Sequence, residues 1–220
     1  MSIHTLLRPL AVTLSLAAGT TFASSALAAG DAARGQALTA VCSACHGPDG
    51  NSAMATFPKL AGLGDKYLLK QLQDIKSGTR PITEMTGLLD NLSDQDLADI
   101  AAYYNSKTTQ LSGAKDIKVL TNNGEEVSAL ELGARMYRGG DKEAGIPACT
   151  GCHSPRGQGN GPAGYPRLSG QHADYVEKQL KDFRAGRRVN DGEAKTMRAI
   201  AERMTDAEIK ALANFVSGLN

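Results

Sequence analysis

The chain has 220 residues, of which 41% are hydrophobic and 21% charged, a mixture that excludes collagen-like, low-complexity and disordered proteins. Its 24 basic and 23 acidic residues form no basic stripe or charged tail, which argues against nucleic-acid binding. Aromatic residues make up only 5% of the chain, and tryptophan is absent. The length allows one or two domains, and two small lobes with so few large side chains need apolar bulk from a non-protein group.

The N-terminus has the pattern of a secretory signal peptide. His4 and Arg8 give a weakly basic start, an apolar run follows from Leu10 to Ala18, and Ala26-Leu27-Ala28 matches a small-residue cleavage site. The apolar run is well short of the roughly 20 residues that a membrane-spanning helix needs. We therefore expect residues 1–29 to be removed, leaving a soluble periplasmic protein without a transmembrane segment.

All four cysteines fall into two C-x-x-C-H motifs, Cys42 to His46 and Cys149 to His153, with Cys45 and Cys152 as the second thiols. This motif is the attachment signature of a c-type haem. Two thiols three positions apart near a helix end face the same side, so they can form thioethers with the two vinyl groups of one porphyrin. The histidine that follows then reaches the iron. The sequence therefore predicts two covalently bound haems c, with His46 and His153 as iron ligands.

Three other interpretations of the cysteines are weaker. A zinc site needs its cysteine pairs some 15–20 residues apart, whereas more than a hundred residues separate these pairs. A thioredoxin-type redox pair belongs in a strand–helix–strand pattern, which the sequence lacks. Disulfides are compatible with an oxidising compartment but do not explain a histidine directly after both pairs.

The chain is an internal duplication. The segment Phe57-Pro58-Lys59-Leu60-Ala61-Gly62 matches Tyr165-Pro166-Arg167-Leu168-Ser169-Gly170. We therefore expect two copies of one haem lobe, at residues 30–107 and 128–220, joined by a linker at residues 108–127. Further matches pair Tyr67, Gln71, Leu72, Gly78 and Arg80 with Tyr175, Gln179, Leu180, Gly186 and Arg188.

Each lobe is predicted to contain three helices in the same order. The first helix runs into the C-x-x-C-H motif, and a middle helix follows from the spacing of apolar residues around 67–75 and 175–183. The last helix starts at a capping box, Thr205 with Glu208, and less completely at Ser93. No stretch alternates with a period of two residues for long enough to predict a sheet. The expected fold class is all-α, with two tandem haem domains.

Two methionines are candidates for the remaining position on each iron. Met85 and Met197 correspond in the repeat, and both are expected in the loop that leads to the last helix of their lobe. Packing roles are expected for Met54, Met136 and Met204. The sequence thus predicts the ligand pairs His46/Met85 and His153/Met197.

A second histidine cannot replace methionine on both irons. Besides the two motif histidines, residues 30–220 contain only His172, for which we expect a surface or capping role. Ligation by histidine and methionine fills both axial positions and raises the reduction potential relative to two histidines. The chemistry that remains is outer-sphere electron transfer.

The two haem motifs, the repeated F/Y-P-K/R-L-A/S-G segments and the paired methionines resemble class I cytochromes c, which implies two tandem domains of that kind. The duplicated arrangement resembles the diheme cytochrome c4 family, over essentially the whole chain after residue 29. The resemblance implies that the carbonyls of Pro58 and Pro166 accept hydrogen bonds from the motif histidines, and that Leu60 and Leu168 pack on the haem faces. It also implies a polar contact between the lobes, for which the candidates are Arg80, Arg188, Tyr67, Tyr175, Gln71 and Gln179.

The function that the resemblance implies is that of a periplasmic electron carrier rather than an enzyme, passing single electrons between redox proteins, toward a membrane complex such as a haem-copper terminal oxidase. The alternative is the cytochrome subunit of an oxidoreductase complex such as a flavocytochrome c sulfide dehydrogenase. A diheme peroxidase is a third class, but it needs an open coordination position, which paired methionine ligands deny.

Overall fold

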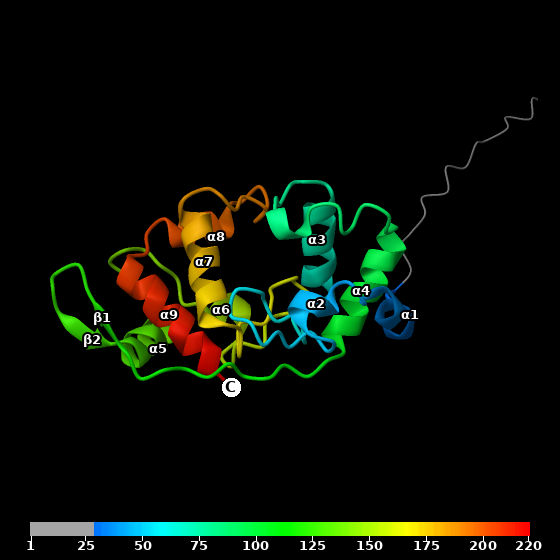
Figure 1. Ribbon diagram of the computed structural model, residues 1–220. Coiled ribbons are helices and arrows are strands. Elements are labelled where there is room, and N and C mark those ends of the chain that lie inside the picture. The colour runs from blue at the N-terminus through cyan, green and yellow to red at the C-terminus, as the bar shows by residue number, and fades with distance from the viewer. Residues whose placement is uncertain (1–28) are drawn as a thin grey trace, which may run out of the picture.

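The computed structural model describes residues 29–220, so the predicted signal peptide lies outside the described residues except for Ala29. Two helical lobes lie side by side, and the chain between them runs along one edge of the molecule (Figure 1). The first lobe contains α1 (Ala32–Leu38), α2 (Ser43–His46), α3 (Asp65–Lys76), the 3-10 turn η1 (Thr83–Met85) and α4 (Asp94–Asn105). The second contains α5 (Ala129–Gly139), α6 (Thr150–His153), α7 (Ala173–Arg184), α8 (Thr196–Ala201) and α9 (Asp206–Gly218).

Each lobe is held by a close crossing of its first and last long helices. In the second lobe, a Cβ atom on Gly133 of α5 would lie 2.3 Å from the carbonyl oxygen of Ala211 on α9. In the first, a Cβ on Gly35 of α1 would lie 2.0 Å from the carbonyl oxygen of Asp99 on α4. Only glycine lets these backbones approach so closely, so the repeat extends to the helix packing.

Both predicted helix starts are confirmed. The side chain of Thr205 accepts a hydrogen bond from the amide of Glu208, whose carboxylate accepts one in return from the Thr205 amide. Ser93 and Asp96 form the same reciprocal box at the start of α4, which is more complete than the sequence predicted. These boxes satisfy amides that would otherwise lack partners in the first turn.

The expectation that the chain forms no sheet is wrong at one place. Strands β1 (Lys118–Leu120) and β2 (Glu126–Ser128) pair antiparallel, with Val119 opposite Val127. The strands are three residues long, too short for a period-two signal, while Asn123-Gly124 supplies the turn. Val119 is 5% exposed and packs in the core of the second lobe.

The chain before the hairpin lies against the second lobe. The Gly113 amide donates to the carbonyl of Ser217 on α9, and the Lys115 amide donates to the side-chain oxygen of Asn214. His172 occupies the N-cap position of α7, but its side chain forms no capping hydrogen bond; instead one ring nitrogen bonds to Ser112 Oγ at 3.0 Å. The other is 2.8 Å from the carbonyl oxygen of Ser52 in the first lobe, so this ring joins the lobes.

The three methionines for which packing roles were predicted differ in their exposure. Met136 and Met204 are 2% and 4% exposed and lie in the core of the second lobe, as predicted. Met54 is 46% exposed, so the packing role expected for it is wrong. Among residues 29–220, no helix is both long enough and apolar enough to span a bilayer.

Candidate haem sites

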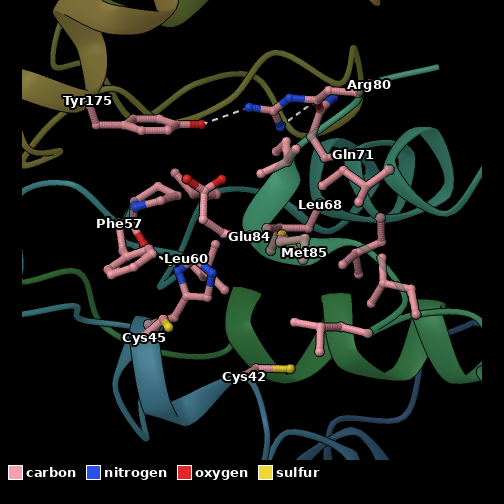
Figure 2. A pocket seen from close by; sticks show the side chains of 18 of the residues that line it. Cys42, Cys45, Phe57, Leu60, Leu68, Gln71, Arg80, Glu84, Met85 and Tyr175 are labelled. Carbon is pink, nitrogen blue, oxygen red and sulfur yellow. Dashed lines mark hydrogen bonds between the residues drawn. The ribbon is translucent and has the colours of Figure 1, made fainter. Parts of the chain in front are cut away.

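A cavity of about 590 Å³ opens in the first lobe beside the C-x-x-C-H motif. Cys42, Cys45, His46 and Met85 all line it, so residues from α2 and η1 meet at one space (Figure 2). Its apolar wall is formed mainly by Leu60, Leu63, Leu68, Leu72, Leu89, Leu92, Ile75 and Ile100. Two thiols for covalent attachment, and an imidazole and a thioether as iron ligands, around an apolar space fit a c-type haem.

The motif histidines are held by the bonds that the resemblance implied. His46 Nδ1 lies 2.8 Å from the carbonyl oxygen of Pro58, and His153 Nδ1 lies 2.9 Å from that of Pro166. A carbonyl can only accept, so Nδ1 carries the hydrogen and Nε2 keeps a free lone pair. Each ring is therefore fixed in the tautomer that binds a metal through Nε2.

Burial keeps both imidazoles neutral. Burial lowers the pKa of His46 and of His153, while the hydrogen bond to the proline carbonyl acts in the opposite direction and does not overcome it. Both rings are 8% exposed. Neutral imidazole is the form that ligates iron.

Cys42 and Cys149 lack the lowered thiol pKa of a reactive cysteine. Burial raises the pKa of Cys149 to about 11 and also raises that of Cys42. Reactive thiols have a lowered pKa, because the thiolate is the nucleophile. All four cysteines are unpaired within the described residues, which fits their use as attachment points.

The second lobe differs at its methionine. Met197 lies on α8, a short helix, where the sequence predicted a loop. Together with Leu168 and Cys149 it is partly buried against the core of that lobe. In the first lobe Met85 ends a single 3-10 turn, so the two candidate ligands are presented by different structures.

The predicted polar contact between the lobes is confirmed. Arg80 donates to Gln71 of its own lobe, at 2.9 Å, and to Tyr175 of the other, at 3.0 Å. Arg188 mirrors this, donating to Gln179 at 2.9 Å and to Tyr67 at 3.1 Å. The side chains come from α3, α7 and the turns after them, where the lobes face each other (Figure 1).

Sequence reasoning missed Asn190. Its Nδ2 donates to Gln71 Oε1 at 2.9 Å and to Asp74 Oδ2 at 2.6 Å, across the boundary between the lobes. Asn190 corresponds in the repeat to Ile82, at the same offset that relates Arg80 to Arg188. Because the two residue types differ, the sequence repeat does not indicate a role for Asn190. The second lobe also supplies Tyr175, Gln179 and Arg188 to the wall of the first cavity.

The family model for cytochrome c matches residues 32–107 and 130–220, one match to each lobe. A cytochrome c4 of Azotobacter vinelandii is 55% identical over 218 residues, which cover 95% of this chain and 98% of that protein. This chain belongs to the cytochrome c4 family. It is therefore an electron-transfer protein with two covalently bound haems c, attached at the Cys42/Cys45 and Cys149/Cys152 motifs.

A solved structure agrees with the sequence relationship. The crystal structure of reduced recombinant cytochrome c4 from Pseudomonas stutzeri matches with a TM-score of 0.80 at 49% identity, covering 87% of this chain and 100% of that one. A more distant relative, a thiosulfate dehydrogenase electron acceptor of Stutzerimonas stutzeri, is 37% identical over 179 residues, which cover 81% of this chain and 78% of that protein.

Proposed function

We propose that His46 and Met85 are the axial ligands of one iron, and His153 and Met197 those of the other. The observation that carries this proposal is the meeting of His46, Met85 and both cysteines of the first motif at one cavity, with Nδ1 of the histidine already bonded. The two lobes are then residues 30–107 and 128–220, joined by a linker at 108–127.

A haem with a histidine and a methionine ligand gains and loses single electrons at a raised potential, without an open position for a substrate. The protein's part is to fix and shield this group. The carbonyls of Pro58 and Pro166 orient the histidines, while Leu60 and Leu168 supply apolar surface that excludes water.

Arg80 and Arg188 are the candidates to hold the carboxylates of the haems. Both are buried, and within residues 29–220 neither forms an ion pair with a carboxylate. Buried guanidinium groups favour anionic partners. Two arginines between the lobes would thus place the carboxylates of both haems at the same contact.

The physiological role that fits is electron transfer in the periplasm from a respiratory donor to a haem-copper terminal oxidase. Reduced holoprotein should be oxidised by membranes that contain such an oxidase, in a reaction that cyanide stops. It should also be recovered from the periplasmic fraction, without residues 1–29. Oxidation that continues at full rate in cyanide, or recovery only from the cytoplasm, would contradict this role.

The second candidate is an electron-accepting subunit of an oxidoreductase complex, such as a flavocytochrome c sulfide dehydrogenase. The specific observation in its favour is the 37% identity to a protein named as a thiosulfate dehydrogenase electron acceptor. Size-exclusion chromatography of native extract separates the two roles. A small species free of other proteins supports the carrier, and co-elution with a flavoprotein or another dehydrogenase supports the subunit.

A further inference from the structure

The segment that presents Met197 is held by a partly buried ion pair between Asp191 and Arg198. Arg198, which follows Met197, donates through Nε to Asp191 Oδ1 at 2.7 Å and through its backbone amide to Oδ2 at 2.9 Å. The side chain of Asp191 is 4% exposed, and Arg198 Nη2 donates to the carbonyl of Val189 at 3.1 Å. Moving Met197 away would therefore break a charged contact that is largely shielded from water.

The same segment is also fixed to the first lobe. Asn190 is 6% exposed and donates to Gln71 and Asp74 on α3, while its carbonyl oxygen accepts from Lys70 Nζ at 2.8 Å. Met197 packs against the core, and Ala201 at the end of α8 is fully buried. Opening this segment costs contacts at both of its ends.

The segment that presents Met85 has no comparable brace. Within the described residues, the side chains of 81–88 form no ion pair and one hydrogen bond, from Thr86 Oγ1 to the carbonyl of Ile82 at 3.4 Å. Leu88 is 44% exposed, and the first strongly buried side chain after Met85 is Leu89 at 2%. Figure 2 shows Glu84 and Met85 beside the cavity, on a single turn.

We propose that the iron of the first lobe is a binding site for small nitrogen-donor ligands, which displace Met85 far more readily than Met197 is displaced in the second lobe. This proposal rests on the axial ligands proposed above. The iron stays ferric: its bond to the Met85 sulfur breaks, a bond to the ligand nitrogen forms, and no electron moves.

The two irons are expected to differ because opening the two methionine segments costs different amounts of free energy. A ligand reaches the iron only while the methionine segment is open, so its apparent affinity falls in proportion to the open fraction. Segments with few buried contacts open most often. Because the Met197 segment must also break the Asp191–Arg198 pair and the Asn190 bonds, we expect the first iron to bind imidazole about tenfold or more tightly than the second.

The test is a titration of the oxidised holoprotein, with both lobes present, with imidazole at fixed neutral pH. The signal is the weak red-edge absorption band that ferric haem shows while a thioether sulfur is bound. We expect the band to disappear in two equal steps, the first at about tenfold lower imidazole concentration than the second. Loss of the whole band in one step would overturn the proposal.

Variants show which iron gives rise to each step of the titration. In Met85→Ala, half of the band should be missing from the start, and the remaining half should disappear at the higher concentration of the wild type. Asp191→Asn should move the second step toward the first. The matched control Glu193→Gln removes an exposed carboxylate from the same segment and should leave both steps in place. An unmoved second step in Asp191→Asn, or disappearance of the remaining half in Met85→Ala at the lower concentration, contradicts the proposal.

The starting spectrum separates this proposal from the one on which it depends. If the oxidised wild type lacks the band before imidazole is added, the methionine ligands themselves are wrong. If the band is present at full strength and the two steps coincide, methionine ligation of both irons is supported. The proposal that Met85 is displaced more readily than Met197 is then contradicted.

Discussion

At the contact between the lobes, an arginine of each lobe donates a hydrogen bond to a tyrosine of the other. Burial pushes the pKa of the Tyr67 hydroxyl up, but the positive charges of Arg188 and Arg80 outweigh it and hold that pKa below its ordinary value. Each tyrosine hydroxyl thus accepts from an arginine of the other lobe, as the dashed line between Arg80 and Tyr175 shows (Figure 2). The bonds that join the lobes therefore connect charged and polar side chains that are buried or partly buried.

Replacing Tyr67 by phenylalanine removes the acceptor of one Arg188 Nη2 bond. Because the same nitrogen also donates to Gln71 at 3.0 Å, the charge keeps a partner, and we expect a loss of about 1 kcal/mol in the free energy of unfolding. Guanidinium denaturation of the holoprotein measures it. Tyr165→Phe is the control, since that side chain is 38% exposed and its hydroxyl forms no hydrogen bond within the described residues. Equal stability of Tyr67→Phe and wild type would contradict the assignment.

Asp99 on α4 ties down the start of α1. Its Oδ1 accepts from the Asp31 amide at 2.7 Å, and its Oδ2 lies 2.7 Å from Arg34 Nη2. Burial acts to raise the pKa of the Asp99 carboxyl, but these donors, with Gln95, hold it below its usual range. The ionised form is therefore favoured by folding.

The sign of the pH dependence follows. A carboxyl with a lowered pKa in the folded state contributes its full stabilisation above the ordinary value of about 4, and loses it as the pH falls through the folded value. We expect Asp99→Asn to be less stable than wild type at pH 7, with the difference shrinking below about pH 4. Thermal unfolding measured from pH 7 to pH 3 tests this, and a difference that is constant with pH would contradict it.

At the level of elements, the lobes depend on helix pairs that touch backbone to backbone. Gly133 on α5 and Gly35 on α1 occupy matching crossings, although the sequence repeat was recognised without them. A side chain at either position must push the last helix away. The same helix provides a control, because a Cβ atom on Gly139 would meet no atom within 4 Å.

We expect Gly133→Ala to destabilise the holoprotein by about 1–3 kcal/mol, the usual cost of forcing extra volume into a packed site. Gly139→Ala should be neutral or slightly stabilising, because alanine favours the helix. Differential scanning calorimetry of the two variants measures the difference. If Gly133→Ala unfolds at the same temperature as Gly139→Ala, the close crossing does not contribute as described.

Helices with strong start signals could be predicted from the sequence, and short elements could not. The boxes at Ser93 and Thr205 are local, so four consecutive residues suffice to identify each of them. Strands β1 and β2 have three residues each and α8 has six, and tertiary packing of Val119 and Met197 stabilises these short elements. Such packing cannot be inferred from local periodicity.

At the level of the whole molecule, the duplication is close at the haem motifs and departs at the methionine segments and at two residues of the lobe contact. Motif residues such as His46 could be identified from one sequence, because covalent attachment fixes both residue type and spacing. The roles of Asn190 and His172 could not be identified in this way, because each forms hydrogen bonds to the first lobe and has no equivalent residue there in the repeat. The first cavity is partly walled by Tyr175 of the second lobe, so the site in the first lobe is not complete without the second.

The central claim is that each lobe holds a haem whose two axial positions are filled by the motif histidine and by Met85 or Met197. The absorption spectrum of the oxidised holoprotein, with the thioether band measured per haem, tests it most directly in wild type, Met85→Ala and Met197→Ala. We predict a full band in the wild type, and half of it in each variant together with the features of high-spin ferric haem. A band that is unchanged in either variant, or absent from the wild type, would contradict the account.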